Sequence, residues 1–162
     1  MAKVIVATGS NLGNRHDHLK QAGKLLNRLS IRPIRKSSIW ESDPVGPALY
    51  PFLNAVCVIH TELAPDELLK QLKSIEEQIG RNKNPERWAP RIIDLDLIAW
   101  NDLAIQSDNL IIPHPEYHSR LFVLYPLQEL CPNWKDPVNR IDIDTMIHNA
   151  SDIRIEKTDL EW

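Results

Sequence analysis

The sequence predicts an α+β domain built on an antiparallel sheet with helices packed against it. Short β-rich runs alternate with helical patterns in the order β-α-β-β-α-β, and proline-rich or polar loops separate them. A further helical region and a short strand extend the chain beyond this core. The order is that of the ferredoxin-like split βαβ arrangement, in which helices cover one face of the sheet.

The composition limits what kind of protein this is. A chain of 162 residues suits one domain with one substantial core, and no repeat or linker divides residues 1–162. The formal net charge of -3, with both signs spread along the chain, argues against a dedicated nucleic-acid or membrane-surface protein. The apolar run before Gly9 is too short for a signal peptide or a membrane span, so we expect a cytoplasmic protein. Cys57 and Cys131 lack metal-binding spacing and are expected to be free thiols.

The first half of the chain is expected to form a strand, a helix and two more strands. The strands are expected at residues 3–8, 34–41 and 52–62, and apolar residues between 19 and 29 recur at helical spacing. The loop at residues 42–51 contains one glycine and three prolines, which allow neither a helix nor a central strand. Long irregular loops in compact domains are commonly functional.

The second half begins with a helix that Pro65 can start and Gly80 can end, because proline suits a first turn and glycine a C-terminal cap. A polar, basic segment at residues 81–91 then leads into a strand at residues 92–100. The remaining expected elements are helices at residues 121–130 and 143–148 and an edge strand at residues 153–157.

The strand at residues 92–100 contains Asp94 and Asp96 at alternate positions, so both carboxylates share one face, with Cα atoms roughly 6.5 to 7 Å apart. A solvent-facing sheet surface would explain two acids, but Ile92, Ile98 and Trp100 are assigned to the same face. If the carboxylates are partly buried, they repel each other by on the order of 2 kcal/mol at an effective dielectric of 20. Divalent cations prefer carboxylate oxygens, so a magnesium site and a plain strand remain alternatives from spacing alone.

The segments around this strand favour the metal. A cationic stretch that leads into an acidic strand suits the binding of a metal-bound polyphosphate. The alternative is an exposed loop whose cations form ion pairs with surface carboxylates. Trp88 in that stretch could stack on a planar ring. Further along, His114 lies between two prolines and Arg120 precedes a helix, which together suggest a second phosphate-binding pair, with Phe122 as an aromatic wall. The cations of the basic stretch are Arg81, Lys83, Arg87 and Arg91.

The ordered set of segments resembles the 6-hydroxymethyl-7,8-dihydropterin pyrophosphokinase family of folate biosynthesis. The matching segments, from residue 4 to about residue 130, are "ATGSNLGNR", "SDPVGP", "FLNAV", "GRNKNPERWAPRIIDLDL" and "PHPEYHSRLFVLYPL". The resemblance implies a ferredoxin-like fold, ATP as co-substrate and two Mg²⁺ ions. It also implies transfer of pyrophosphate to the hydroxymethyl group of a reduced pterin, with release of AMP.

The same resemblance implies roles for individual residues. On the nucleotide side, Asp94 and Asp96 match the ligands of both magnesium ions, and His114 and Arg120 match the phosphate-binding pair. The other nucleotide-side matches are Arg91 before the acidic strand, Arg81 and Lys83 in the basic loop over ATP, Trp88 above the substrates, and Glu76 at a nucleotide contact.

On the pterin side, Phe52 and Phe122 match the two rings that enclose the pterin, and Asn54 matches the amide that recognises its edge. Two rings and one amide suit a flat ring with a polar edge. The backbone from Ser42 through Val45 to Gly46 would add polar contacts to that edge. The resemblance supplies no general base.

The chain departs from the family pattern at three positions. Ala89 stands where glycine is usual, Lys83 where many members have arginine, and Asn109 where some carry a basic nucleotide contact. These departures affect expected rates and ATP affinity rather than the reaction class.

Two rival interpretations remain. One is another two-metal enzyme on this fold, such as a nucleotidyltransferase or cyclase, which would need a further metal-binding carboxylate or nucleic-acid contacts. The other is a non-catalytic RNA-binding or regulatory module, for which exposed aromatic residues on a basic sheet face would be expected. We expect small-molecule partners, no nucleic acid and no membrane, and leave association with other folate-pathway enzymes open.

Overall fold

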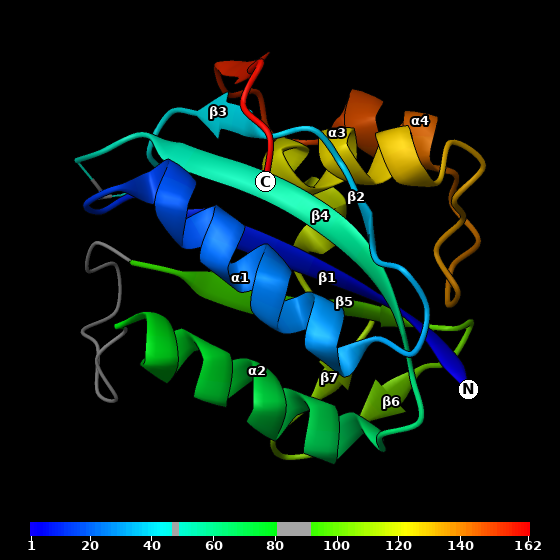
Figure 1. The fold of residues 1–162 in the computed structure, drawn as a ribbon. Coiled ribbons are helices and arrows are strands. Elements are labelled where there is room, and N and C mark those ends of the chain that lie inside the picture. Colours follow the sequence, from blue (N-terminus) through cyan, green and yellow to red (C-terminus); the bar gives the residue numbers. More distant parts are fainter. Residues whose placement is uncertain (47–48, 81–91) are drawn as a thin grey trace.

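The computed structural model describes residues 1–46, 49–80 and 92–162, and its main feature is an antiparallel sheet in the strand order β5-β1-β4-β3-β8 (Figure 1). Strand β2 pairs with β4 beside this path. The α+β prediction is confirmed. The strands of the sheet are β1 (Ala2–Ser10), β2 (Arg35–Lys36), β3 (Trp40–Ser42), β4 (Phe52–Thr61), β5 (Asp94–Trp100) and β8 (Ile155–Lys157).

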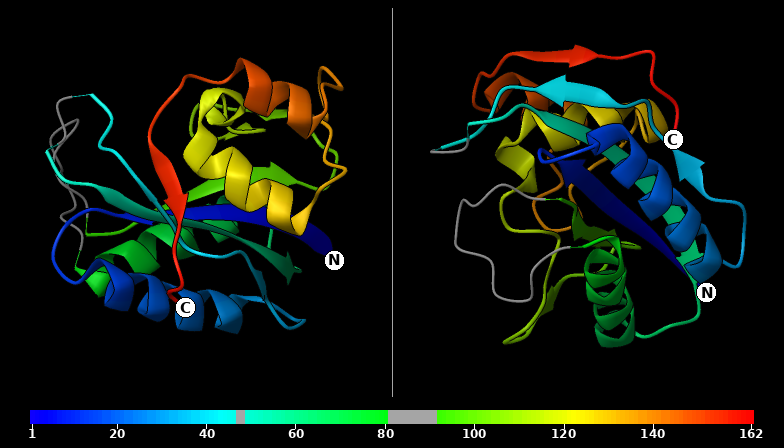
Figure 2. Two further views of the ribbon diagram at one scale, coloured as in Figure 1. Left: turned by 90° about the horizontal axis from the view of Figure 1, so that it is seen from above. Right: turned by 60° about the vertical axis from the view of Figure 1, so that its left-hand side comes forward.

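Helices cover both faces of the sheet, whereas the sequence predicted one covered face. Helices α1 (Arg15–Leu29) and α2 (Pro65–Ile79) lie on one side, and α3 (Leu121–Leu130) and α4 (Ile143–Asn149) lie on the other (Figure 2). Each face has its own buried cluster, one including Leu19 and Leu72 and the other including Leu124 and Met146. The chain beyond the βαββαβ core therefore supplies the second helical layer.

The helix ends follow the expected local chemistry. The Asn14 side chain caps α1 by accepting the Asp17 N–H at 3.0 Å, and Pro65 occupies the first turn of α2. Gly80 ends α2 with a φ of 120°, a conformation that side chains with a Cβ rarely adopt. These caps define where each helix begins and ends.

The strand expected at residues 34–41 is divided into β2 and β3. The break lies at Ser37, whose hydroxyl accepts the Val56 N–H at 2.9 Å while its own N–H donates to the Val56 carbonyl. One extra residue fits between the paired parts, because Lys36 lies opposite Cys57 but Trp40 lies opposite Asn54. A serine side chain thus replaces a ladder hydrogen bond and shifts the register.

A bulge in β5 changes which side chains face the core. Val6 pairs with Leu97 and Ile5 with Ala99, so Ile98 is the extra residue. Beyond it the alternation of faces is reversed: Trp100 joins the cluster beneath α1 and α2, and Ala99 joins the one beneath α3 and α4. The sequence placed these two residues on the opposite faces, because a regular strand was assumed.

The chain between β5 and α4 contains elements that the sequence did not predict. These are a two-stranded hairpin of β6 (Ile105–Gln106) and β7 (Ile111–Ile112), and a 3₁₀ turn at Tyr117–Ser119. Cys57 and Cys131 are free, as expected, and full burial raises the pKa of the Cys57 thiol to about 12. Among the helices described, none is long and apolar enough to cross a membrane.

Candidate active site

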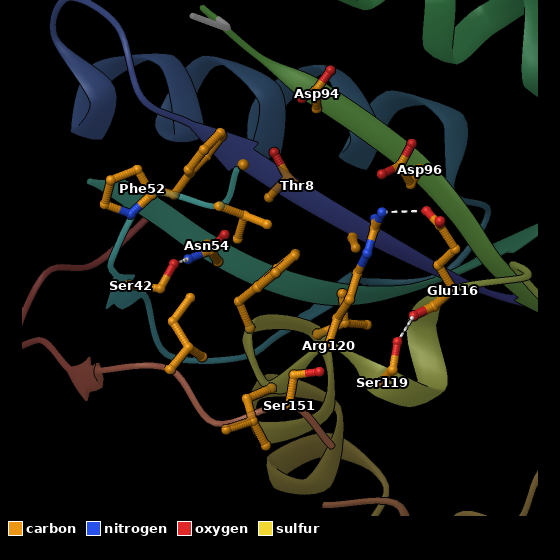
Figure 3. Close-up of a pocket in the computed structure, with 18 of the residues that line it drawn as sticks. Thr8, Ser42, Phe52, Asn54, Asp94, Asp96, Glu116, Ser119, Arg120 and Ser151 are labelled. Atoms are coloured by element: carbon orange, nitrogen blue, oxygen red, sulfur yellow. Dashed lines mark hydrogen bonds and ion pairs between the residues drawn. The ribbon is translucent and has the colours of Figure 1, made fainter. Parts of the chain in front are cut away.

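A pocket of about 730 Å³ opens on the sheet face that carries α3. Its floor comes from β1, β4 and β5, one wall comes from the start of α3, and another comes from the chain between α4 and β8 (Figure 3). The polar and aromatic residues that line it include Ser42, Phe52, Asn54, Asp94, Asp96, Glu116, Ser119, Arg120, Phe122, Ser151 and Asp152.

The floor is organised around Gly9 of β1. Gly9 pairs with Asn54 of β4 on one side and with Asp94 of β5 on the other. Directly opposed residues point to the same face of a sheet, so Asn54 and Asp94 both face the pocket, about 9 to 10 Å apart across two strand spacings. A Cβ at Gly9 would lie 3.5 Å from the Asn54 side-chain oxygen and 3.6 Å from the Phe52 ring. Glycine therefore leaves the space between the two ends of the floor open.

The Asn54 amide presents an acceptor to this space. Its nitrogen donates to the Ser42 hydroxyl at 2.9 Å and to the Trp40 carbonyl at 3.2 Å, which uses both of its N–H groups. The side-chain oxygen then remains on the Gly9 side. A buried amide fixed in this way can accept hydrogen bonds from the N–H groups of a bound ring.

Two phenylalanines line the pocket at this end. Phe52 begins β4 and Phe122 lies in the first turn of α3, so they reach the pocket from the floor and from the wall. The Arg120 guanidinium lies 5.7 Å from the centre of the Phe122 ring. Helix α3 is also stacked on the sheet through Tyr125 and Trp40, with ring centres 5.2 Å apart. The predicted aromatic pair thus shares one pocket with Asn54.

The carboxylates of Asp94 and Asp96 occupy the other end, on β5 (Figure 3). Asp94 is half-buried and Asp96 is exposed to the pocket. The backbone between them is fixed by Glu76 of α2, whose buried carboxylate accepts the Leu95 N–H at 2.8 Å. Glu76, expected at a nucleotide contact, thus lies in the helix layer behind the two aspartates.

Arg120 lines this pocket, whereas His114 lines a separate pocket with Tyr117 and His118 and interacts electrostatically with Asp96 and Arg120. Arg120 forms an ion pair with Glu116 at the pocket edge. The backbone N–H of His114 donates at 2.9 Å to the carbonyl of Ile98, the bulge residue of β5. The ring Nδ1 of His114 accepts the backbone N–H of Glu116 at 3.2 Å. An accepting Nδ1 leaves the proton of the neutral ring on Nε2, where it can be donated to a ligand.

The environment of His114 favours the neutral ring. Burial lowers the pKa of His114 below its usual value of 6.5, and the Arg120 charge lowers it too, whereas Asp96 and Glu116 oppose the shift. His114 is therefore a neutral hydrogen-bond donor at neutral pH rather than a fixed positive charge.

A buried hydrogen-bond network supports the turn that carries Glu116 and Arg120. The Tyr117 hydroxyl donates to Asp136 at 2.6 Å and accepts from the Trp134 indole at 3.3 Å. Burial would raise the pKa of Asp136, but hydrogen bonds from Tyr117 and from the Asn139 and Val138 N–H groups hold it below its usual value. The same surroundings raise the pKa of Tyr117 well above its usual range.

The structure brings most of the predicted residues together. Asp94, Asp96, Phe52, Asn54, Ser42, Val45, Arg120 and Phe122 all line the pocket. Gly46 lies beyond Val45 with a φ of 64°, and Asn109 is exposed near the β6–β7 hairpin. The predicted residues outside the described part of the chain are Arg81, Lys83, Arg87, Trp88, Ala89 and Arg91.

Sequence reasoning missed several residues that line the pocket, including Thr8, Gly9 and Ser119, and two further groups matter most for its walls. One is Glu116, whose position four residues before Arg120 would have suggested an ion pair across one turn. The other is the segment Ser151, Asp152 and Ile153, which carries no motif and reaches the pocket only through the tertiary fold.

Comparisons with known proteins show which family the sequence matches. Residues 5–132 match the family described as 7,8-dihydro-6-hydroxymethylpterin-pyrophosphokinase (HPPK). The 2-amino-4-hydroxy-6-hydroxymethyldihydropteridine pyrophosphokinase of Bacillus subtilis is 44% identical over 128 residues, which cover 78% of this chain and 76% of that protein. The Pseudomonas aeruginosa protein of the same name is 39% identical, with 85% and 86% covered.

Longer proteins also contain a similar region. A folate synthesis bifunctional protein of Arabidopsis thaliana is 43% identical over 79% of this chain but only 27% of its own length. The crystal structure of wild-type Plasmodium falciparum HPPK-DHPS has a similar fold, with a TM-score of 0.70, 18% identity, and coverage of 91% of this chain and 43% of that one. At that identity the structural similarity concerns the fold alone.

The environment of His114 predicts how its pKa responds to its neighbours. We expect a pKa below 6.5 in the native protein, lowered further in Asp96→Asn and raised in Arg120→Gln. Imidazole ¹⁵N–¹H NMR titration of the native protein and of each variant measures these values. In the unfolded chain His114 takes up a proton near pH 6.5, whereas in the folded protein it takes up the proton only at lower pH. The His114 contribution therefore lowers the free energy of unfolding as the pH falls below about 6.5. A native pKa at or above 6.5 would contradict the assigned environment.

The Tyr117 network predicts a loss of stability when its hydroxyl is removed. Tyr117→Phe leaves the Trp134 indole N–H without its acceptor and removes one donor from Asp136, so we expect the unfolding free energy to fall by about 1 to 3 kcal/mol. Urea denaturation measures this. The matched control is Tyr50→Phe, at an exposed ring, for which the change should stay below about 0.5 kcal/mol. Equal effects of the two substitutions would argue against the network.

Proposed function

The chain belongs to the 7,8-dihydro-6-hydroxymethylpterin-pyrophosphokinase family, and from this membership and the pocket we infer how it works. It is an ATP-dependent pterin diphosphokinase of folate biosynthesis, which transfers pyrophosphate from ATP to 6-hydroxymethyl-7,8-dihydropterin and gives the pterin diphosphate and AMP. One observation carries the assignment of residues: Gly9 separates an amide and aromatic end of the floor from a carboxylate end. A pterin and a polyphosphate fit these two ends.

We propose that the pterin binds between Phe52 and Phe122. Its flat ring suits the two phenyl faces, and its N–H edge suits the acceptor that Asn54 presents. Ser42 holds the amide in that orientation through the 2.9 Å hydrogen bond. The hydroxymethyl group would then point along the floor past Gly9 toward Asp94.

We propose that Asp94 and Asp96 hold the two magnesium ions. The donor set fits, because hard divalent cations prefer carboxylate oxygens and these two side chains face the same pocket. The charge balance supports it too: four carboxylates and one guanidinium stand among the described lining residues, so a polyphosphate needs added positive charge there. Bound magnesium would supply neutralisation of phosphate charge and orientation of the reacting oxygens.

The remaining residues position the phosphates. In the transfer, the pterin hydroxyl oxygen forms a bond to the β-phosphorus, the bond from that phosphorus to the AMP oxygen breaks, and the hydroxyl proton is released to solvent. Arg120 can donate hydrogen bonds to phosphate oxygens, either while it keeps its ion pair with Glu116 or after that ion pair breaks. Neutral His114 can donate a hydrogen bond through Nε2. Alignment and charge stabilisation of this kind account for most catalysis of phosphoryl transfer.

Several broader predictions remain proposals. We propose that residues 1–162 act as one catalytic domain, since β8 pairs with β3 in the same sheet. The cytoplasmic location and the roles of Arg81, Lys83, Trp88 and Arg91 also stay predictions. Relatives named folate synthesis bifunctional protein support association with another folate-pathway enzyme as a further proposal.

The assay that tests the function identifies the nucleotide product. With ATP, Mg²⁺ and 6-hydroxymethyl-7,8-dihydropterin, we expect AMP to form in equal amount to the pterin diphosphate. The matched control replaces the pterin with 6-methyl-7,8-dihydropterin, which lacks the attacking hydroxyl and should give no AMP. Release of ADP or pyrophosphate instead would overturn the assignment and favour a kinase, a nucleotidyltransferase or a cyclase.

The aspartate pair can be tested separately. Asp94→Asn and Asp96→Asn should each lower turnover at least about a hundredfold, because positioned charge at the transferred phosphate is lost. Pterin affinity should remain close to that of the wild type. Electron paramagnetic resonance should show that less Mn²⁺ is bound in the presence of ATP. Asp102→Asn, at the exposed turn beyond the other end of β5, is the control and should leave turnover unchanged. Full Mg²⁺-dependent turnover in either variant would falsify the metal role.

A further inference from the structure

The pocket has a wall that comes from outside the region matched by the family. Ser151, Asp152 and Ile153 line it, and they lie between α4 and β8, whereas the family match ends at residue 132. Figure 3 shows Ser151 on the side of the pocket away from Asp94 and Asp96. We call residues 150–162 the C-terminal strap.

The strap is joined to the sheet next to the proposed pterin site. Its strand β8 pairs with β3, with Ile155 opposite Ser42 and Lys157 opposite Trp40. These two β3 residues are also the ones that hold the Asn54 amide. The wall residues come immediately before Ile155, so the β8–β3 pairing determines where they lie.

The far end of the strap is anchored to the segment between β2 and β3 and to helix α1. Thr158 donates to the Ile39 carbonyl through its N–H at 2.9 Å and through its hydroxyl at 2.8 Å. The Trp162 indole donates to the Ser37 carbonyl at 2.8 Å. The Trp162 ring packs on Gly23 of α1, where a Cβ would lie 3.2 Å from the ring and would force it to move. A glycine inside a helix, otherwise unfavourable, is explained by this contact.

The strap also holds the start of the loop at residues 42–51. The Asp43 N–H donates to the Arg154 carbonyl at 3.0 Å, and the Asp43 carboxylate lies 3.4 Å from the Arg154 side chain. The next two residues, Pro44 and Val45, line the pocket. One segment therefore supplies a wall of the pocket and also fixes a second part of its lining.

The position of the strap separates it from the phosphate end. In the sheet order β5-β1-β4-β3-β8, the strap is on the opposite edge from the strand that carries Asp94 and Asp96. A substitution in the strap can therefore alter the positions of Ser42, Asn54 and Val45 without altering β1. An effect on pterin binding is thus separable from an effect on nucleotide binding.

Resting on the proposed function, we propose that the C-terminal strap is part of the pterin site and contributes to pterin affinity. Ile153 and its neighbours form the outer wall against the bound ring, and the anchors at Thr158 and Trp162 hold that wall in place. Ile153 lines the site directly, while Thr158 and Trp162 are positioning residues.

The test measures two affinities for each variant by calorimetry: that for 6-hydroxymethyl-7,8-dihydropterin and that for Mg²⁺ with the non-hydrolysable analogue α,β-methylene-ATP. Ile153→Ala and Trp162→Ala should each weaken pterin binding about tenfold, the scale expected for lost contacts in an apolar pocket, and change nucleotide binding less than about twofold. Trp162→Phe, which keeps a ring over Gly23, should recover most of the loss.

The matched controls are Ile141→Ala and Arg140→Ala, at exposed positions before α4, which should change neither affinity. Circular dichroism and thermal unfolding check that each variant is folded, and Thr158→Ala provides a milder change if Trp162→Ala unfolds. Unchanged pterin affinity in Ile153→Ala and in the anchor variants overturns the proposal, as do equal losses for both ligands. Wild-type protein that does not bind the pterin overturns the proposed function itself, a result distinct from either.

Discussion

The register of β1 between β4 and β5 is the constraint on which the site depends. Because Gly9 lies opposite both Asn54 and Asp94, an amide acceptor and a carboxylate face one pocket at a separation set by strand spacing. A slip of one residue in either pairing would turn one of them to the opposite face, into the apolar layer beneath α1 and α2. Both faces of β1 carry buried apolar residues, Val4 and Val6 on one and Ile5 and Ala7 on the other, so the cost of such a slip comes mainly from burying Asn54 or Asp94 among apolar side chains.

Departures from regular strand geometry then place the residues around this floor. The bulge at Ile98 turns Trp100 toward α1 and α2, and the Ile98 carbonyl accepts the His114 N–H. The Ser37 irregularity similarly shifts β3 so that Trp40 lies opposite Asn54 and Ser42 opposite Phe52. Each irregularity brings a site residue into position, as is common for bulges near functional sites.

The two helical layers have different tasks. The α1 and α2 layer forms one buried cluster and, through Glu76, holds the β5 backbone between the two aspartates. The α3 and α4 layer forms the pocket wall, with Phe122 and Arg120 at its edge and the Tyr117–Asp136 hydrogen bond beneath the turn that carries them. Residues 151–153 of the strap line the pocket at the end proposed for the pterin. Strands, helices and the strap thus position the described pocket-lining residues from several directions.

The sequence by itself determined the main elements and the chemistry. Periodicity located both long helices and the principal strands, and alternate spacing put Asp94 and Asp96 on one face, because these signals depend only on neighbouring residues. The family resemblance indicated Phe52, Asn54, Arg120 and Phe122. Only the tertiary structure decided the second helical layer, the exchanged faces of Ala99 and Trp100, the place of Glu76 behind β5, and the wall at residues 151–153. These features arise from pairing and packing between segments far apart in the chain, which no local pattern encodes.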